Sequence, residues 1–223
     1  MNRFVKIAIA GEGGQGVQSI ADIIAEAGNE EGMEALYIPN FGIEQRGGVS
    51  VAYVQISDRL IGSPKFKKGD IVVALSKRAV NRTRSYVGEN TIFVYDNSLI
   101  AIPEVKDEII GLQTYETAVP EDQAEGCGSE EIDRTVYLPS HAAKIIGVPA
   151  TDIANKELNP RVFNVIILGA VIEAAAIVSE DNIKKAIEHK LGNKFKKNPK
   201  LRELNFNALQ RGMEIIREAL VRS

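Results

Sequence analysis

Cysteine is almost absent from this chain of 223 residues, which contains only Cys127. A single cysteine excludes an internal disulfide and cannot supply the several thiolates of an iron–sulfur cluster or a structural zinc site. The two histidines, His141 and His189, have no second histidine or carboxylate at metal-ligand spacing. The sequence also lacks the serine, cysteine and histidine constellation of a nucleophilic enzyme. We therefore expect no metal site and no catalytic residue in this chain.

Long hydrophobic runs are scarce as well. The longest, residues 162–178, is slightly short of a membrane span and includes Asn164, Gly169 and Glu173. It favours a helix buried in the core or against a partner. The apolar run near the N-terminus is too short for a signal peptide. We therefore expect a cytoplasmic protein without membrane contact.

The net charge of −3 is unevenly distributed. Residues 104–133 carry ten acidic side chains and one basic side chain, Lys106, which gives −9 and leaves +6 for the remainder. A basic body suggests a surface that meets phosphates or acidic partners. The acidic stretch is interpreted as an insertion or surface excursion within a single domain spanning 1–223, and a solvated loop explains it equally well.

Two basic stretches, residues 76–84 and 189–202, raise the question of nucleic-acid binding. Their cations are Lys77, Arg78, Arg82 and Arg84 in the first, and Lys190, Lys194, Lys196, Lys197, Lys200 and Arg202 in the second. Neither stretch interleaves aromatic residues that could stack on bases. Solvated helix faces or subunit contacts are the favoured interpretation, and no nucleic-acid partner is expected.

The order of apolar runs and helical patterns predicts an α/β protein: a three-layer α/β/α sandwich around a mostly parallel, Rossmann-like sheet. The alternating pattern of one strand indicates that it is antiparallel. The predicted strands cover residues 3–10, 34–38, 49–57 (the alternating one), 70–75, 91–96 and 134–138. The predicted helices cover residues 16–31, 77–87, 139–147, 161–178, 181–190 and 200–221.

A glycine-rich loop, "GEGGQG" at residues 11–16, joins the first predicted strand to the first predicted helix. Gly11, Gly13 and Gly16 match G-x-G-x-x-G, and Gly14 adds room for close approach. In this position, backbone N–H groups and a helix N-terminus can receive a phosphate.

Two well-known nucleotide sites fit the loop poorly. A dinucleotide site needs an acid near the end of the second strand to bind the ribose hydroxyls, but that strand ends in "LYIPNF". A Walker loop needs G-K-[S/T], whereas this sequence continues "GVQS". Another phosphate ligand, or a tight turn without any ligand, stays open at this point.

A second motif, "EQRGG", precedes the alternating strand. Arg46 offers a planar set of donors for phosphate or carboxylate, and Gly47 and Gly48 allow close backbone approach. Alone, this would be a hairpin turn with an exposed arginine. Together with a glycine loop at the carboxyl end of the first strand, it indicates a ligand-handling or partner-docking surface.

Four ordered motifs along the chain resemble the gamma subunit, or gamma domain, of the 2-oxoacid:acceptor (ferredoxin) oxidoreductases. These are "GEGGQGV", "FGIEQRGGVSVAYVQIS", "GDIVVAL" and "NVIILGA", and "NFNALQRG" resembles the end of these proteins. The branch that acts on 2-oxoglutarate or branched-chain ketoacids is the most similar. The acidic stretch at 104–133 is longer than this family leads us to expect.

The resemblance implies a subunit of an enzyme that converts a 2-oxoacid and coenzyme A to acyl-CoA and carbon dioxide and passes electrons to ferredoxin. Thiamine diphosphate, magnesium and iron–sulfur clusters would reside on alpha, beta and delta partner subunits. The resemblance further implies a contribution to coenzyme A binding from Gly11, Gly13, Gly14, Gln15 and Gly16, with Arg46, Gly47 and Gly48 in the neighbouring loop. The same loops could instead form the interface with the alpha subunit, and a stand-alone nucleotide- or cofactor-binding module is the alternative function.

Overall fold

The structure is a computed structural model that describes residues 3–41, 48–100 and 136–222. Its strands form one six-stranded sheet in the order β2-β3-β1-β4-β5-β6. The strands are β1 (Phe4–Glu12), β2 (Glu34–Asn40), β3 (Val49–Ser57), β4 (Ile71–Ala74), β5 (Ile92–Asp96) and β6 (Lys144–Val148). The predicted acidic insertion at 104–133 lies outside the described residues.

The direction of the strands confirms a mostly parallel sheet with one antiparallel strand. β1, β4, β5 and β6 pair in parallel, with Ile7 opposite Ile71 between β1 and β4. β3 is antiparallel to both of its neighbours, β1 and β2. The antiparallel strand predicted at 49–57 is therefore confirmed, and it separates β1 from β2.

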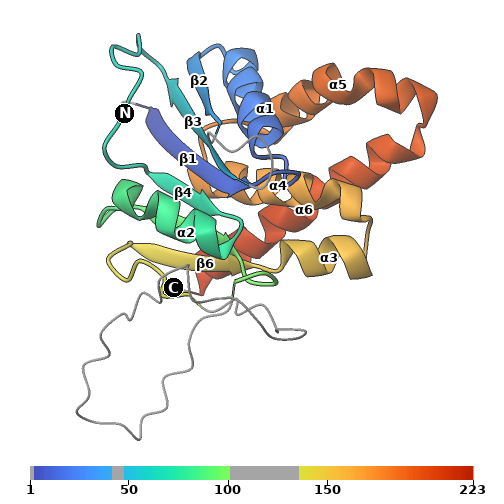
Figure 1. Cartoon of the computed structure of the whole chain (residues 1–223). Helices are drawn as coiled ribbons and strands as arrows, with labels where there is room; N and C mark the ends of the chain where they lie inside the picture. Colours follow the sequence, from blue (N-terminus) through green and yellow to red (C-terminus); the bar gives the residue numbers. More distant parts are fainter. Residues whose placement is uncertain (1–2, 42–47, 101–135, 223) are drawn as a thin grey trace, which may run out of the picture.

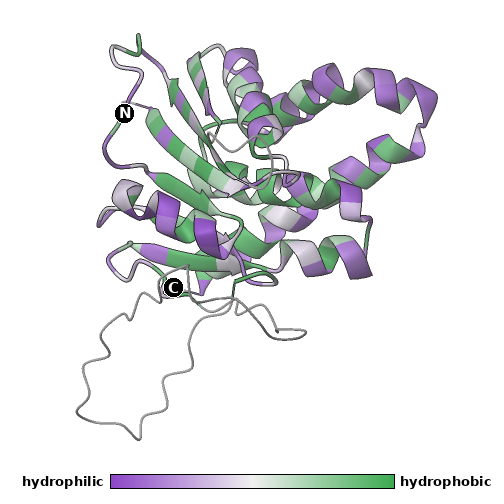
Figure 2. Cartoon of the chain, in the orientation of Figure 1, coloured by the Kyte–Doolittle hydropathy of each residue, from purple (hydrophilic) through white to green (hydrophobic). Residues whose placement is uncertain are grey.

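Helices lie on both faces of the sheet, as a three-layer sandwich requires (Figure 1). The α-helices are α1 (Val17–Glu30), α2 (Lys77–Thr83), α3 (Ala150–Lys156), α4 (Phe163–Ala175), α5 (Glu180–Lys197) and α6 (Lys200–Val221). Two short 3-10 helices, η1 (Arg84–Tyr86) and η3 (Pro160–Val162), follow α2 and precede α4. Figure 2 shows that α4 and the inner strands are mainly hydrophobic, whereas α5 is mainly hydrophilic.

Alternate residues of β1 divide the core into two parts. Ile7 and Ile9 belong to the larger cluster, which contains the apolar faces of α1, α4, α5 and α6. Ala8 and Ala10 belong to the smaller cluster on the opposite face, which includes residues of α2. This division follows from the two-residue period of a strand that is covered on both sides.

Two neighbouring predictions, the strand at 134–138 and the helix at 139–147, were wrong. Residues 136–138 of the strand predicted at 134–138 do not pair in the sheet, although Val136 is buried in the smaller cluster. The helix predicted at 139–147 is instead a turn followed by β6, which pairs with β5. In β6, Ile146 and Val148 are buried while Ile145 is exposed, which is the alternation of a strand at the edge of a sheet.

The remaining differences concern element ends and one missed helix. The helix predicted at 77–87 ends as α2 at Thr83 and continues as η1. The helix predicted at 181–190 continues to Lys197, so most of the second basic stretch is helical. The prediction missed α3, which has only seven residues. No helix in the described parts of the chain is long and apolar enough to cross a membrane.

α4 is the predicted buried helix, and α6 crosses it at two glycines. Residues 165–172 of α4 are all buried. A Cβ atom on Gly169 would overlap the carbonyl oxygen of Leu209, and one on Gly212 would overlap that of Ile166. The two backbones touch here, so neither position has room for a side chain.

We predict that Gly169→Ala lowers the free energy of unfolding by about 3 kcal/mol, since the added methyl group meets rigid backbone. Gly192→Ala on α5 is the matched control, because a Cβ there meets nothing within 4 Å. This control should be neutral or stabilising by up to about 1 kcal/mol, the helix preference for alanine. Urea unfolding of the full chain measures both, and equal effects would contradict the packing described.

The start of α5 is fastened to the end of α1 by Glu31. Its Oε2 accepts hydrogen bonds from the Ser179 backbone N–H at 3.0 Å, the Ser179 hydroxyl at 2.9 Å and the Asn182 amide at 2.7 Å. The bond from the Ser179 backbone, followed by that from Asn182, lowers the pKa of Glu31. A carboxylate at a helix N-terminus is also favoured by the helix dipole.

A lowered folded-state pKa means that the Glu31 contribution exists above the unfolded-state pKa and disappears as pH falls through the folded-state value. We expect Glu31→Gln to cost about 1 kcal/mol near pH 7 and nothing below the folded-state pKa of Glu31. Glu30→Gln is the control, because Glu30 is exposed and its side chain makes no hydrogen bond or ion pair with the described residues. Chemical unfolding at a series of pH values tests this, and a pH-independent cost would contradict it.

Candidate functional site

The carboxyl ends of β1 and β4 mark the position, here called the crevice, where an open α/β sheet usually binds ligands. β1 leads into α1 on one face of the sheet, and β4 leads into α2 on the other. The chain therefore leaves these neighbouring strands in opposite directions, which defines a topological switch point. The glycine-rich loop at residues 11–16 lies at this crevice.

Two glycines of the loop have backbone angles that other residues rarely adopt. Gly14 has φ of 95° and Gly16, the N-cap of α1, has φ of 74°. No side chain caps α1 in the described structure, and its first turn holds no acidic residue. The N–H groups at the start of α1 are therefore available to an anion or a partner.

The other two glycines differ sharply in their surroundings. A Cβ on Gly11 would lie 2.7 Å from Oε1 of Gln15 and 2.8 Å from a methyl group of Val17, so Gly11 is required for packing. A Cβ on Gly13 would meet nothing within 4 Å, and Gly13 has no positive φ. Among the described residues, Gly13 therefore has neither a neighbour nor a backbone angle that requires a glycine.

The Gln15 side chain makes two hydrogen bonds within the protein. Its Oε1 accepts a hydrogen bond from the Glu12 backbone N–H at 2.6 Å, and its Nε2 donates to the Leu75 carbonyl at 2.9 Å. Because Leu75 directly follows β4, the Gln15 side chain spans the crevice and ties the loop to β4. Gln15 thus positions the loop.

Asn164, near the start of α4, supports the loop from behind. A Cβ on Gly16 would approach the Asn164 side chain to 2.9 Å, so the two residues are in close contact. Sequence analysis noted Asn164 only as a polar residue in an apolar run. Nothing in its local pattern indicates this contact, because it depends on how α4 packs against α1 and against β4 and β5.

The second motif is only partly described. Arg46 and Gly47 lie outside the described residues. Gly48 directly precedes β3, whose first residue, Val49, pairs with Glu12 at the end of β1. The structure therefore brings Gly48 beside the beginning of the glycine loop.

The end of β2 lies away from the glycine loop. β3 lies between β1 and β2, so two strand spacings, about 10 Å, separate the end of β2 from β1. In a dinucleotide-binding fold the second strand is the neighbour of the first. The geometry therefore disfavours a Rossmann-type ribose contact, in agreement with the missing acid.

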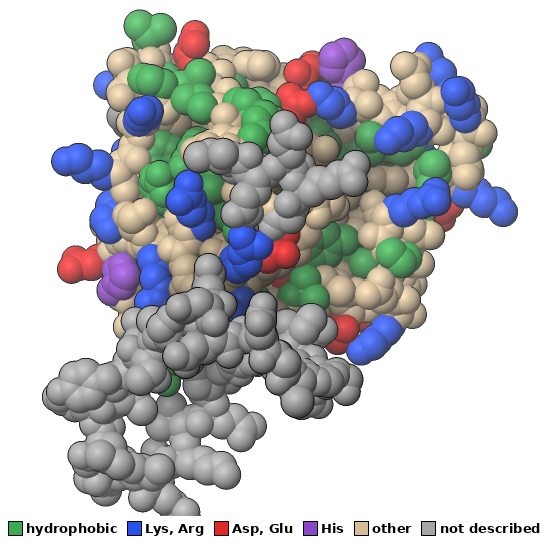
Figure 3. Space-filling view, viewed as in Figure 1, with side chains coloured by type: hydrophobic (Ala, Val, Ile, Leu, Met, Phe, Trp, Pro, Cys, Tyr) green, Lys and Arg blue, Asp and Glu red, His purple; other side chains and the backbone are tan. Residues whose placement is uncertain are grey.

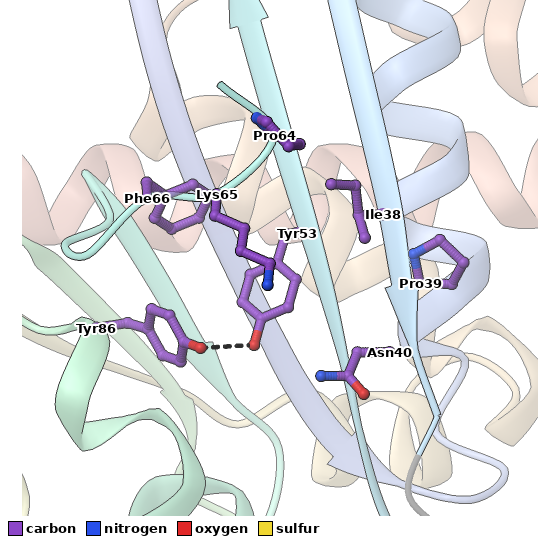
Figure 4. A pocket seen from close by; sticks show the side chains of 8 residues that line it. All are labelled: Ile38, Pro39, Asn40, Tyr53, Pro64, Lys65, Phe66 and Tyr86. Atoms are coloured by element: carbon purple, nitrogen blue, oxygen red, sulfur yellow. Dashed lines mark hydrogen bonds between the residues drawn. The ribbon is translucent and has the colours of Figure 1, made fainter. Parts of the chain in front are cut away.

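A second hollow, of about 290 Å³, lies on the face of β2 and β3 that is opposite α1 (Figure 4). Its lining includes Asn40, Tyr53, Lys65, Phe66 and Tyr86. The hydroxyl groups of Tyr53 and Tyr86 are hydrogen bonded at 2.8 Å, and the Tyr53 and Phe66 rings meet edge to face with centroids 5.7 Å apart. This cluster could not be predicted from the sequence, because its aromatic residues come from separate segments.

Burial of the Tyr53 hydroxyl and its hydrogen bond with Tyr86 raise the pKa of Tyr53 to about 12, although Asn40 and Arg82 act in the opposite direction. This phenol therefore stays protonated at physiological pH. The hollow offers apolar ring faces and hydroxyl groups, with Lys65 as the charged side chain of its lining. Such a surface can bind a flat group or a side chain of a partner, but it holds no general base.

A buried carboxyl at the end of β5 was also missed. Burial raises the pKa of Asp96, and hydrogen bonds from Thr151 and Ser98 oppose this effect. The Thr151 hydroxyl donates to Asp96 Oδ2 at 2.5 Å, which fastens α3 to the sheet. Asp96 is the last residue of β5 and belongs to neither β1 nor β4, so it supports the structure beside the crevice.

The basic residues are mainly on the surface of helices. Figure 3 shows lysine and arginine side chains gathered around α2 and along the far part of α5. Several have partners within the chain: Lys190 pairs with Asp22, Arg202 with Glu188, and Arg84 donates to the Tyr137 carbonyl at 2.7 Å. His141 contacts the Val87 carbonyl and His189 lies 3.0 Å from Glu26.

Comparison with known proteins gives a consistent result. The sequence matches the family of pyruvate ferredoxin/flavodoxin oxidoreductases over residues 6–215. The 2-oxoglutarate synthase subunit KorC of Methanocaldococcus jannaschii is 29% identical, with 96% of this chain and 94% of that protein covered. The common gamma subunit of pyruvate/ketoisovalerate oxidoreductases of Thermococcus litoralis is 30% identical, with 88% and 92% covered.

Some relatives are much longer. The ketoisovalerate oxidoreductase subunit VorA of Methanothermobacter thermautotrophicus is 28% identical over 96% of this chain, but this chain spans only 37% of its length. The region equivalent to this chain is therefore one part of a larger polypeptide in that protein.

Solved structures share the fold. The gamma subunit of a keto/oxoacid ferredoxin oxidoreductase from Geobacter sulfurreducens has a TM-score of 0.67 at 23% identity, covering 95% of this chain and 98% of that one. A 2-oxoglutarate:ferredoxin oxidoreductase from Magnetococcus marinus, solved with 2-oxoglutarate, coenzyme A and succinyl-CoA, has a TM-score of 0.70 at 22% identity. This chain covers 32% of the Magnetococcus chain. The sequence match over nearly the whole chain and the shared fold agree: the protein belongs to the pyruvate ferredoxin/flavodoxin oxidoreductase family and corresponds to its gamma-type subunit.

Proposed function

We propose that this chain is the gamma subunit of a multi-subunit, thiamine-diphosphate-dependent 2-oxoacid:ferredoxin oxidoreductase. Such an enzyme decarboxylates a 2-oxoacid, transfers the acyl group to coenzyme A and passes two electrons to ferredoxin. The observation that carries this proposal is the near full-length match to separate subunits such as KorC. In VorA, the region that matches this chain is only part of a longer polypeptide. This is consistent with a domain that works in contact with other protein domains.

Thiamine diphosphate, magnesium and the iron–sulfur clusters are bound, in this proposal, by partner subunits of the alpha, beta and delta type. The single cysteine cannot bind an iron–sulfur cluster. Among the described residues, no three histidine, cysteine, aspartate or glutamate side chains are grouped as metal ligands. The contribution of this chain is therefore binding and assembly.

The glycine loop is proposed to face coenzyme A at the crevice between β1 and β4. The uncapped start of α1 supplies N–H donors for a phosphate, and Gly13 leaves room for close approach. Gly48, placed beside this loop, extends the proposed contact toward Arg46 and Gly47. The competing possibility is that the same loop contacts the larger alpha subunit.

Assembly provides the direct test of the subunit role. An affinity-tagged full chain, co-expressed with its partner subunits, should co-purify with them. The complex should reduce ferredoxin only when a 2-oxoacid and coenzyme A are both present, and the chain alone should be inactive. Full turnover by this chain alone, or by the partner subunits without it, would contradict the proposal. Saturable dinucleotide binding by the isolated chain would favour the alternative of a stand-alone module.

Gly13→Val tests the coenzyme A contact, because Gly13 has neither a positive φ nor a neighbouring atom that forbids a side chain. We expect the assembled enzyme to show a KM for coenzyme A raised roughly tenfold, with kcat within about twofold of wild type. Gly192→Ala is the control, and size-exclusion chromatography verifies assembly of both variants. An assembled Gly13→Val enzyme with an unchanged KM would assign the loop to a structural role, whereas loss of assembly would assign it to the subunit interface.

A further inference from the structure

A cleft of about 470 Å³ lies between α1, the start of α4, and the facing parts of α5 and α6. In Figure 1, α5 and α6 diverge from their shared turn. Both helices contribute residues to the lining of the cleft. Its volume is within the range of small-molecule sites. It belongs to the helical layer, on the side of the sheet that carries α1 and α4.

The floor of the cleft is apolar. Ile23, Val165 and Phe195 line it and are each less than a tenth exposed. Leu201 and Leu204 of α6 complete the apolar wall as half-buried side chains. These residues come from four helices, so the cleft is a product of the tertiary fold.

The mouth of the cleft is cationic. Arg161, Lys190 and Lys194 line it, and no aspartate or glutamate is among its lining residues. Lys190 is paired with Asp22. The side chains of Arg161 and Lys194 have no hydrogen-bond or ion-pair partner among the described residues. An apolar floor below two uncompensated cations is complementary to a molecule with an anionic head and an apolar tail.

A polar residue near the start of α4, Asn164, also lines the cleft. Its side chain makes no hydrogen bond in the described structure. The same side chain contacts Gly16, the N-cap of α1. A bound ligand that reaches Asn164 would therefore touch a side chain that itself contacts the glycine loop.

We propose that this cleft binds a small amphipathic anion, a carboxylate or phosphate monoester with an unbranched or branched apolar tail. Arg161 and Lys194 bind the anionic head, and the tail lies over Val165, Phe195 and Leu204. The ligand site is separate from the proposed coenzyme A contact and does not depend on it. Through Asn164 and Gly16, occupancy of the cleft acts on the conformation of the loop.

Titration calorimetry of the full chain with chemically simple probes tests the proposal. Octanoate and octyl phosphate carry both head and tail and distinguish the two anions, whereas 1-octanol has only the tail and inorganic phosphate only the head. We expect at least one of the two amphipathic anions to bind saturably, and each isolated part to bind at least tenfold more weakly. Across a carboxylate series, affinity should rise about fourfold per methylene until the cleft is filled, which is the effect of 0.8 kcal/mol per buried CH₂.

The variants Arg161→Gln and Lys194→Gln should each weaken binding by roughly tenfold at low salt. Lys196→Gln is the matched control, because Lys196 is exposed on the same helix and does not line the cleft. An equal loss in all three variants would show nonspecific charge attraction and overturn the proposal. The absence of binding up to millimolar probe would also overturn it. Binding by the isolated chain that disappears in the assembled enzyme would assign the cleft to a subunit contact instead.

Discussion

The close contact between the backbones of α4 and α6 sets the position of α4 in the helical layer. Gly169 and Gly212 let the two helix backbones touch, so α4 is covered by α6 on one side and by the sheet on the other. This position fixes the start of α4, where Asn164 contacts Gly16 of the glycine loop. The same helix provides Val165 to the cationic cleft. The contact between α4 and α6 thus helps to position both Asn164, which supports the glycine loop, and Val165, which lines the cleft.

The residues of the glycine loop fall into two groups: those that contact the rest of the protein, and those that are directed outward. Gln15 and Gly11 serve the protein's own packing. The Gln15 side chain is hydrogen bonded to Leu75 after β4, and Gly11 leaves space for the Gln15 side chain. Gly13 and the uncapped start of α1 are directed outward. A loop of this kind presents backbone donors in a fixed arrangement without needing a charged side chain of its own. β3 adds a further constraint, because it removes β2 from the crevice and with it the ribose contact of a dinucleotide fold.

Much of this fold could be predicted from the sequence, because strong local patterns decided it. The first strand and helix, the alternating strand at 49–57 and the apolar helix around Leu168 are all present. The region after residue 133 was misassigned, because β6 is short and lies at the sheet edge, with Ile145 exposed. A brief apolar run of that kind is compatible with a helix or a strand until its pairing partner is known.

Only part of the candidate site could be predicted from the sequence. The motifs located the glycine loop and Gly48 correctly beside each other, since both flank the paired ends of β1 and β3. The bridging role of Gln15, the support from Asn164 and the Tyr53–Tyr86 pair could not be predicted. Each joins residues that are distant in sequence, so only the packing of the helices and strands reveals them.

Hydrogen–deuterium exchange of the assembled enzyme, with and without coenzyme A, tests most directly the claim that the loop faces this substrate. The relevant readout is the exchange rate of amides in residues 13–18, compared with those at the start of α5, around Asn182. If the loop faces coenzyme A, exchange in the loop slows on addition of coenzyme A and does not change at α5. Unchanged exchange in the loop of an enzyme that turns over coenzyme A would contradict this claim.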